Sequence, residues 1–230
     1  TVFLSLPALS RDLGFENRAN VLLVSGKAGS RPDADTVRRA LKQAWTLDDA
    51  GFEIRDVQGG AASELRTKRV FLALPVVEAA LSLHPAARPV LTYFVNELRR
   101  GEAATPYSFV AAPGEPIVPP GMDDGEIILN DWLALDLRAK AGDAIRLTYF
   151  VPGPRRDVEE KSSEFRVRAV VPLKGIYADR DLLPDFPGLT GINNSRDWDP
   201  GIPIHMDRIR AKDEAYWDRY RGTPKAFLTL

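Results

Sequence analysis

The chain has 230 residues, of which 44% are hydrophobic, enough for one large core or two small ones. Its 31 basic and 32 acidic side chains are balanced, which gives no electrostatic basis for binding nucleic acid or an anionic lipid surface. Cysteine is absent, which excludes disulfides, thiolate nucleophiles and cysteine-ligated metal sites.

The first 112 residues alternate short apolar runs with segments of helical length, which predicts a mixed α/β part. A helix is expected at Asp33–Trp45, with Asp33 as its N-cap, because Val37, Leu41 and Trp45 recur at four-residue spacing. A second helix is expected from Pro75 to Leu83, since proline suits a first helical turn. Strands are expected at residues 2–6, 20–24, 52–57, 70–74, 89–95 and 107–111.

No segment reaches the roughly 20 apolar residues that a membrane span needs. The most apolar window, residues 70–83, is interrupted by Pro75 and Glu78. The chain starts in a strand-like stretch without an N-terminal methionine or a signal-peptide pattern, which indicates a part of a longer protein.

Residues 113–124 are rich in proline and glycine and predict a linker. Residues 174–222 lose regular periodicity while prolines and aromatic residues accumulate, which is typical of an irregular cover packed over a sheet. The last segment, Thr223–Leu230, is strand-like, as the first residues are.

Between these stretches, residues 126–171 follow a clear order of elements. A short apolar strand leads into a one-to-two-turn helix, which Asn130 or Asp131 is expected to cap and in which Trp132 is expected to be buried. Strands that alternate at residues 144–151 and 164–171 then predict a hairpin with a charged, solvated loop. The landmarks of this pattern are Ile128, Leu129, Asn130, Leu133, Ala134, Leu137, Lys140, Gly142, Asp143, Ile145, Leu147, Phe165, Val167 and Val171.

In this order and spacing, the landmarks resemble the extracytoplasmic domains of FtsX/MacB-type ABC transporter permeases. Residues 91–112, 179–189 and 197–227 are similar to long members of the same family. The resemblance implies an α+β (mixed α/β) fold, a MacB-like periplasmic core. Its expected parts are a porter-like α/β part at residues 1–112, a linker and smaller β-rich subdomain at 113–175, and an irregular, aromatic-rich segment at 176–230 that returns to the α/β part.

The resemblance also implies a function. The domain would be non-catalytic, would lie on the periplasmic side of a bacterial cytoplasmic membrane, and would relay ATP-driven conformational change to a substrate or an accessory protein. Its partner would be a cytosolic ATP-binding subunit, reached through membrane spans outside this chain, and the permease could be a dimer. No catalytic residue, cofactor or metal is expected.

Two other classes of function stay open. A secreted hydrolase could use the acidic cluster Asp179, Asp181, Asp185, Asp197 and Asp199, although such aspartates more often cap turns beside prolines. Asp179 and Asp181 fit two positions of a calcium loop, but Leu183 breaks the third. A carbohydrate- or protein-binding module could use Trp132, Trp198 and Trp217.

Other chemistry-bearing residues lack the context of a known site. The two histidines, His84 and His205, have neither cysteine partners nor an HExxH spacing, so no metal site is expected. The loop Gly26–Arg31 lacks the spacing of a phosphate-binding loop. No GxSxG motif surrounds Ser5, Ser10, Ser108 or Ser163.

Overall fold

The fold was analysed in a computed structural model that describes residues 5–12, 21, 23–26, 33–67, 69–153 and 158–230. The chain divides into two compact units, Thr1–Ala50 and Gly51–Leu230. The described helices mix with sheet in an α+β fold, as expected. None of these helices is both long enough and apolar enough to cross a bilayer.

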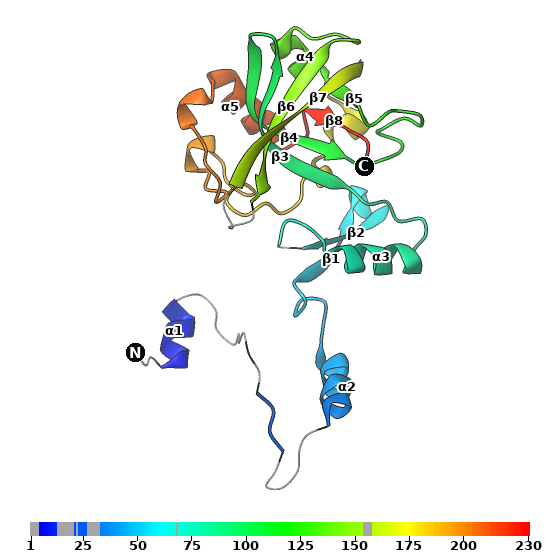
Figure 1. The fold of residues 1–230 in the computed structure, drawn as a ribbon, viewed down its shortest axis with the longest axis vertical. Coiled ribbons are helices and arrows are strands. Elements are labelled where there is room, and N and C mark those ends of the chain that lie inside the picture. Colours follow the sequence, from blue (N-terminus) through cyan, green and yellow to red (C-terminus); the bar gives the residue numbers. More distant parts are fainter. Residues whose placement is uncertain (1–4, 13–20, 22, 27–32, 68, 154–157) are drawn as a thin grey trace. The chain divides into compact units, whose positions relative to one another are not determined.

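The first unit contains two described helices, α1 (Leu6–Asp12) and α2 (Ala34–Ala44) (Figure 1). The carboxylate of Asp33 accepts hydrogen bonds from the backbone N–H groups of Asp35 and Thr36, which confirms the predicted cap of α2. The strand predicted at residues 20–24 is not formed by Val21, Leu23 and Val24, which are exposed. An apolar run becomes a strand only when a neighbouring strand satisfies its backbone, and none pairs with these described residues.

Two other predictions for this unit fall partly outside the described residues. Most of the strand predicted at residues 2–6 lies outside them, and its last residue, Leu6, begins α1 instead. The loop Gly26–Arg31 lies outside them from residue 27 onward.

The second unit begins with an antiparallel ribbon of β1 (Phe52–Val57) and β2 (Ala62–Thr67), joined by the short 3-10 turn η1 (Gln58–Gly60). The helix α3 (Leu74–Leu83) follows, so the strand and the helix predicted here are confirmed. The strand predicted at residues 70–74 is wrong. Val70 has a φ of 71°, which turns the chain so that Phe71 stacks on Tyr93, with ring centres 5.8 Å apart.

The rest of the second unit is built on a closed six-stranded barrel in the order β3-β4-β8-β5-β7-β6 (Figure 1). The hairpins β3–β4 and β6–β7 are antiparallel, which confirms the predicted hairpin. The strands are β3 (Leu91–Arg100), β4 (Ala103–Ala112), β5 (Glu126–Asn130), β6 (Ala144–Pro152), β7 (Val158–Val171) and β8 (Ala226–Phe227).

Strands that precede residue 113 in the chain and strands that follow it belong to the same barrel. The strand β8, from the end of the chain, pairs in parallel with β4 and antiparallel with β5. The part boundary expected after residue 112 therefore lies between two strands of one barrel. The stretch expected to be a linker also packs against the barrel, because Ile117, Val118 and Met122 are buried beside Ile128 and Phe227.

The barrel core is closed at one side by the helix α4 (Asp131–Leu137). Leu133 and Leu137 on this helix are fully buried among the inward side chains of the strands. Oδ1 of Asn130 accepts a hydrogen bond of 2.8 Å from the backbone N–H of Leu133, so Asn130 is the N-cap. A helix of seven residues depends on such a cap, since it has few backbone hydrogen bonds of its own.

Residues 174–222 cover the opposite face of β3 and β4. Aromatic rings from both layers form one cluster, in which Phe94 and Phe109 of the sheet contact Phe186, Trp198 and Trp217 of the cover. The predicted cover is thus confirmed. It consists of the 3-10 turns η2 (Gly175–Ala178), η3 (Arg180–Leu182), η4 (Ser195–Asp197) and η5 (Met206–Arg208), and of the helix α5 (Ala211–Tyr220).

Gly188 holds two distant parts of this cover together. Its carbonyl accepts a 3.0 Å hydrogen bond from the N–H of Asp199, and a Cβ at Gly188 would lie 1.8 Å from the carbonyl oxygen of Asp199. Its φ is 78°. A Gly188→Ala change must therefore force the two segments apart as well as strain the backbone.

We expect Gly188→Ala to lower the free energy of unfolding by ~3 kcal/mol more than Gly191→Ala does. Gly191 is the matched control, because its φ is 81° but no atom lies within 4 Å of a Cβ there. Gly191→Ala should show only the backbone strain, about 1–2 kcal/mol. Urea denaturation of both variants measures the difference, and equal losses would show that the contact between Gly188 and Asp199 is not formed.

Candidate functional site

The chain enters and leaves the barrel at the same end. Leu91, the first residue of β3, pairs with Ala112, the last residue of β4. Phe227, the last residue of β8, pairs with Ala111, and the N–H of Leu228 donates to the carbonyl of Ala111 at 2.9 Å. The incoming and outgoing segments thus flank the same end of β4 (Figure 1).

The segment that leads into β8 is fixed by one buried amide, Asn130, which has no exposed surface. Its Nδ2 donates to the hydroxyl of Tyr216 at 3.1 Å and to the carbonyl of Pro224 at 3.3 Å. The hydroxyl of Tyr216 in turn donates to the carbonyl of Thr223 at 3.1 Å. The start of α4, the helix α5 and the segment before β8 therefore meet here. We call the group Asn130, Tyr216, Thr223, Pro224 and Lys225 the exit joint.

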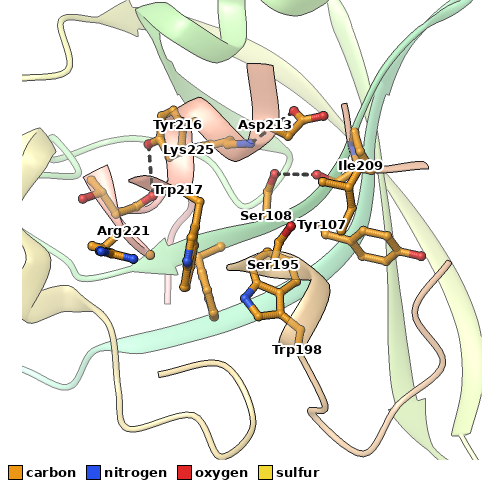
Figure 2. Close-up of a pocket in the computed structure, with 14 residues that line it drawn as sticks. Tyr107, Ser108, Ser195, Trp198, Ile209, Asp213, Tyr216, Trp217, Arg221 and Lys225 are labelled. Atoms are coloured by element: carbon orange, nitrogen blue, oxygen red, sulfur yellow. Dashed lines mark hydrogen bonds and ion pairs between the residues drawn. The ribbon is translucent and has the colours of Figure 1, made fainter. Parts of the chain in front are cut away.

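Lys225, the last member of the exit joint, is buried and has a charged side chain. Its Nζ lies 4.3 Å from the ring centre of Trp132, 4.6 Å from that of Tyr216 and 4.0 Å from Oδ1 of Asp213. Figure 2 shows the amine directed toward Asp213. Burial lowers the pKa of Lys225 to about 8, even though the nearby carboxylate favours the charged form.

A chain of ion pairs extends from Lys225 toward the surface. Arg210 donates to both carboxylate oxygens of Asp213 at 2.7 Å and to Oδ2 of Asp136 at 2.6 Å. Lys212 also contacts Asp136, which accepts a further bond from Thr105 at 2.6 Å. Burial would raise the pKa of Asp136, but the hydrogen bonds from Lys212, Thr105 and Arg210 outweigh it and hold this pKa below its usual range.

The cavity beside the exit joint is small. Its volume of about 20 Å³ is the space for about one water molecule, whereas ligand pockets reach several hundred Å³. Figure 2 shows Ser108 and Tyr107 of β4, Ser195 and Trp198 of the cover, and Lys225 around it. A larger surface hollow of about 370 Å³ is lined by Arg196, Met206, Ile209, Ala211 and Glu214.

The predicted acidic cluster has structural contacts. Asp179 accepts a hydrogen bond of 2.9 Å from the N–H of Asp181 and so caps η3. Oδ1 of Asp181 lies 3.5 Å from Nη2 of Arg55 on the ribbon, while Asp197 and Asp199 are exposed. Among the described residues, no three histidine, aspartate or glutamate side chains are grouped so as to hold a metal ion.

The predicted aromatic platform is not exposed. Trp198 and Trp217 are buried edge to face, with ring centres 4.9 Å apart. Trp132, expected to be buried, is partly buried between Lys225 and Tyr216. The three tryptophans therefore belong to the packing of the barrel and its cover.

The remaining candidates lie apart from the exit joint. His84 is exposed at the end of α3. His205 is also exposed, and its backbone N–H donates to the hydroxyl of Tyr107 at 2.7 Å. Ser108 lines the small cavity and donates to the carbonyl of Pro106, and the Ser163 hydroxyl lies 3.0 Å from that of Tyr149.

Sequence reasoning found Asn130 as a helix cap but missed Lys225, Asp213 and Tyr216. One signal was available, because Lys225 is a charged residue inside the strand-like segment TPKAFLTL. A lysine in such a run is buried only when partners surround it, and these partners come from α4 and α5.

The exit joint has the chemistry of a structural connection. Asn130, Tyr216, Thr223 and Pro224 are joined by hydrogen bonds, the neighbouring carboxylate of Asp213 is held by Arg210, and the cavity beside the group has a volume of about 20 Å³. No protein-family model matches the chain, and no curated protein sequence matches it either.

Lys225 should make the stability of the protein depend on pH. Between the folded pKa of about 8 and the ordinary value of 10.5, the unfolded chain binds more protons than the folded one. The free energy of unfolding therefore rises with pH in this window, by at most ~3 kcal/mol. Urea denaturation at pH 8.0 and 9.5 should show this rise, and Lys225→Met should remove it. An equal rise in Lys225→Met would assign it to other groups.

Proposed function

We propose that this chain is a non-catalytic extracytoplasmic domain of an ABC transporter permease of the FtsX/MacB kind, with a MacB-like core. It relays ATP-driven movement to a substrate or an accessory protein on the periplasmic side of the membrane. The ATP-binding subunit lies in the cytosol and acts through membrane spans outside this chain.

The observation that carries this proposal is the position of the two connections of the barrel. Both flank the end of β4, at the pairs Leu91–Ala112 and Ala111–Phe227. A closed barrel attached through two adjacent segments moves as one body when these segments are displaced, because its own strands keep their pairing. This is the mechanical property that a relay needs.

A ring contact and an ion pair join the barrel and its cover to residues 52–71. Phe71 stacks on Tyr93, and Arg55 pairs with Asp181 at 3.5 Å, with both charged side chains about one-third exposed. An exposed ion pair of this kind contributes about 0–1 kcal/mol. This ion pair therefore opposes a swing of the barrel against the ribbon only weakly.

The polar landmarks of the resemblance also support a scaffold role. Asn130 caps α4 and ties the exit joint. Gly142 takes a φ of 91° in the turn before β6, and Oδ2 of Asp143 accepts a hydrogen bond of 2.9 Å from the N–H of Lys140 in the same turn. Each of these residues shapes the backbone, which supports a scaffold role.

Reversible cross-linking in the intact transporter tests the proposal. The chain has no cysteine, so Arg55→Cys with Asp181→Cys introduces a unique thiol pair across the ribbon and the cover. A short reducible bifunctional thiol reagent should then suppress transport-coupled ATP hydrolysis, and reduction should restore it. The control pair Arg146→Cys with Glu164→Cys joins neighbouring exposed positions within the β6–β7 hairpin and should have no effect.

Two results would contradict a relay. One is full ATP hydrolysis and transport with the Arg55–Asp181 cross-link in place. The other is turnover of a substrate by the isolated chain that Asp181→Asn or Asp199→Asn abolishes without a change in melting temperature, which would favour the secreted hydrolase.

A further inference from the structure

The barrel is closed by its shortest strand. β8 has two residues, yet it lies between β4 and β5. Three backbone hydrogen bonds of 2.9 Å flank it: from Lys225 N–H to Phe109, from Leu228 N–H to Ala111, and from Asn130 N–H to the carbonyl of Lys225. We call this junction of β4, β8 and β5 the exit seam. β8 also has two register pairs with each neighbour, fewer than any other two neighbouring strands of the barrel share, so we expect the barrel to separate first at this seam.

Protonation of Lys225 destabilises the closed exit seam. The Asp213 carboxylate, at 4.0 Å from Nζ, lies beyond hydrogen-bond distance and is already held by Arg210. The charged groups around Lys225 are two carboxylates, Asp213 and Asp136, and two cations, Arg210 and Lys212. These four charges cancel, so the ammonium adds an unmatched buried charge, which is unfavourable. Tyr216, the other titratable neighbour, stays neutral because burial raises its pKa.

We propose that Lys225 is a proton-controlled lock on the exit seam. When the amine is neutral, β8 is held firmly between β4 and β5. When a proton from solvent binds the amine, β8 separates from the seam more often, together with the residues that follow it, while the pairing of β3 with β4 and of β6 with β7 is kept. Lys225 then reaches water, where the ammonium is stable.

The seam also has the space and position that such a lock requires. The cavity of about 20 Å³ is lined by Lys225, Thr223 and Tyr216, so there is free space beside the residue that has to move. The segment released is the outgoing connection of the barrel. The lock is a property of this chain by itself and does not depend on the transporter proposal.

The rate at which a thiol reagent labels a single introduced cysteine measures opening of the seam. Ala226→Cys places a thiol on β8, where Ala226 is fully buried, and Val95→Cys places one on β3, where Val95 is equally hidden. Labelling rates of the isolated chain are measured at pH 6.5 and 9.0, each divided by the rate of a free cysteine peptide at that pH. The same measurement is made with Ala226→Cys in a Lys225→Met background.

We expect Ala226→Cys to label faster than Val95→Cys at both pH values, because the seam opens without the rest of the barrel. Its corrected rate should fall about tenfold from pH 6.5 to 9.0, the factor that pKa values of 8 and 10.5 give for closed and open Lys225. In the Lys225→Met background the corrected rate should not change with pH.

Equal rates at the two positions would overturn the proposal, as would a pH dependence that survives Lys225→Met. If Ala226→Cys does not fold, amide exchange of the Leu228 N–H, corrected for intrinsic rates and compared with amides of β3, gives the same two comparisons. Equal exchange at Leu228 and at the β3 amides, or a pH dependence that survives Lys225→Met, would overturn the proposal.

Discussion

Replacing Asn130 with alanine is expected to lower the free energy of unfolding by about 3–5 kcal/mol. The change removes the N-cap of α4, which is worth about 1 kcal/mol. It also leaves the buried hydroxyl of Tyr216 and the carbonyl of Pro224 without their amide donor, at about 1–3 kcal/mol each. Denaturation in urea measures the loss.

Asn194→Ala is the matched control for this prediction. Asn194 also caps a short helical turn, by accepting from the N–H of Arg196 at 2.9 Å, but it is exposed and has no second role in the described hydrogen bonds. Asn194→Ala should lower the free energy of unfolding by less than about 1 kcal/mol. A similarly small loss for Asn130→Ala would mean that the exit joint does not hold the barrel and the cover together.

The second large effect is expected for Phe227→Ala, with a loss of about 3–5 kcal/mol. Phe227 is fully buried, pairs with Ala111 and Ile128 across the exit seam, and meets the ring of Tyr177 at 5.6 Å. Removing its ring takes away most of the apolar contact of a two-residue strand. Amide exchange should therefore show lost protection first at Leu228 and Lys225.

Phe71→Ala provides the comparison for Phe227→Ala. Phe71 has a ring contact with Tyr93, but it is 48% exposed, so its truncation should lower the free energy of unfolding by less than about 1 kcal/mol. Equal effects of the two changes would contradict the placement of β8 inside the barrel.

Local elements of this fold can be predicted from the sequence where a single capping residue or a regular spacing of apolar residues determines them. The cap at Asp33 and the alternation of β6 and β7 were predicted correctly, and of the two caps predicted for α4, Asn130 or Asp131, the structure has Asn130. In each case the deciding contacts lie within a few residues, or between neighbouring strands with a clear period of two. The aromatic cover was predicted from composition, since accumulated aromatic rings bury much apolar area without periodic structure.

Pairing between distant segments could not be predicted in the same way. Nothing in TPKAFLTL indicates that β8 enters between β4 and β5, because the register depends on strands more than 90 residues earlier. The linker prediction overlooked Ile117, Val118 and Met122, which are buried because Phe227 arrives beside them. The helix α5 was missed because one of its three buried positions is the charged Asp213, so Tyr216 and Trp217 alone do not show an apolar helical period.

The candidate site was predictable only at Asn130. Lys225 can be recognised as part of a site only from its contacts with Trp132 on α4 and with Tyr216 and Asp213 on α5. Their common location is set by packing and not by any spacing along the chain. The resemblance to permease domains named Asn130 as a landmark, and the exit joint gives that landmark a physical role.

Movement of the barrel as one body is tested most directly by spin-label distances, with and without ATP, in the transporter that we propose. Leu135→Cys on α4 and Lys161→Cys on β7 are exposed positions within the barrel, and Glu78→Cys is exposed on α3. We predict that ATP shifts the distance between labels at residues 135 and 78 and leaves the distance between labels at 135 and 161 unchanged. A constant first distance, or a change within the barrel, would contradict the relay.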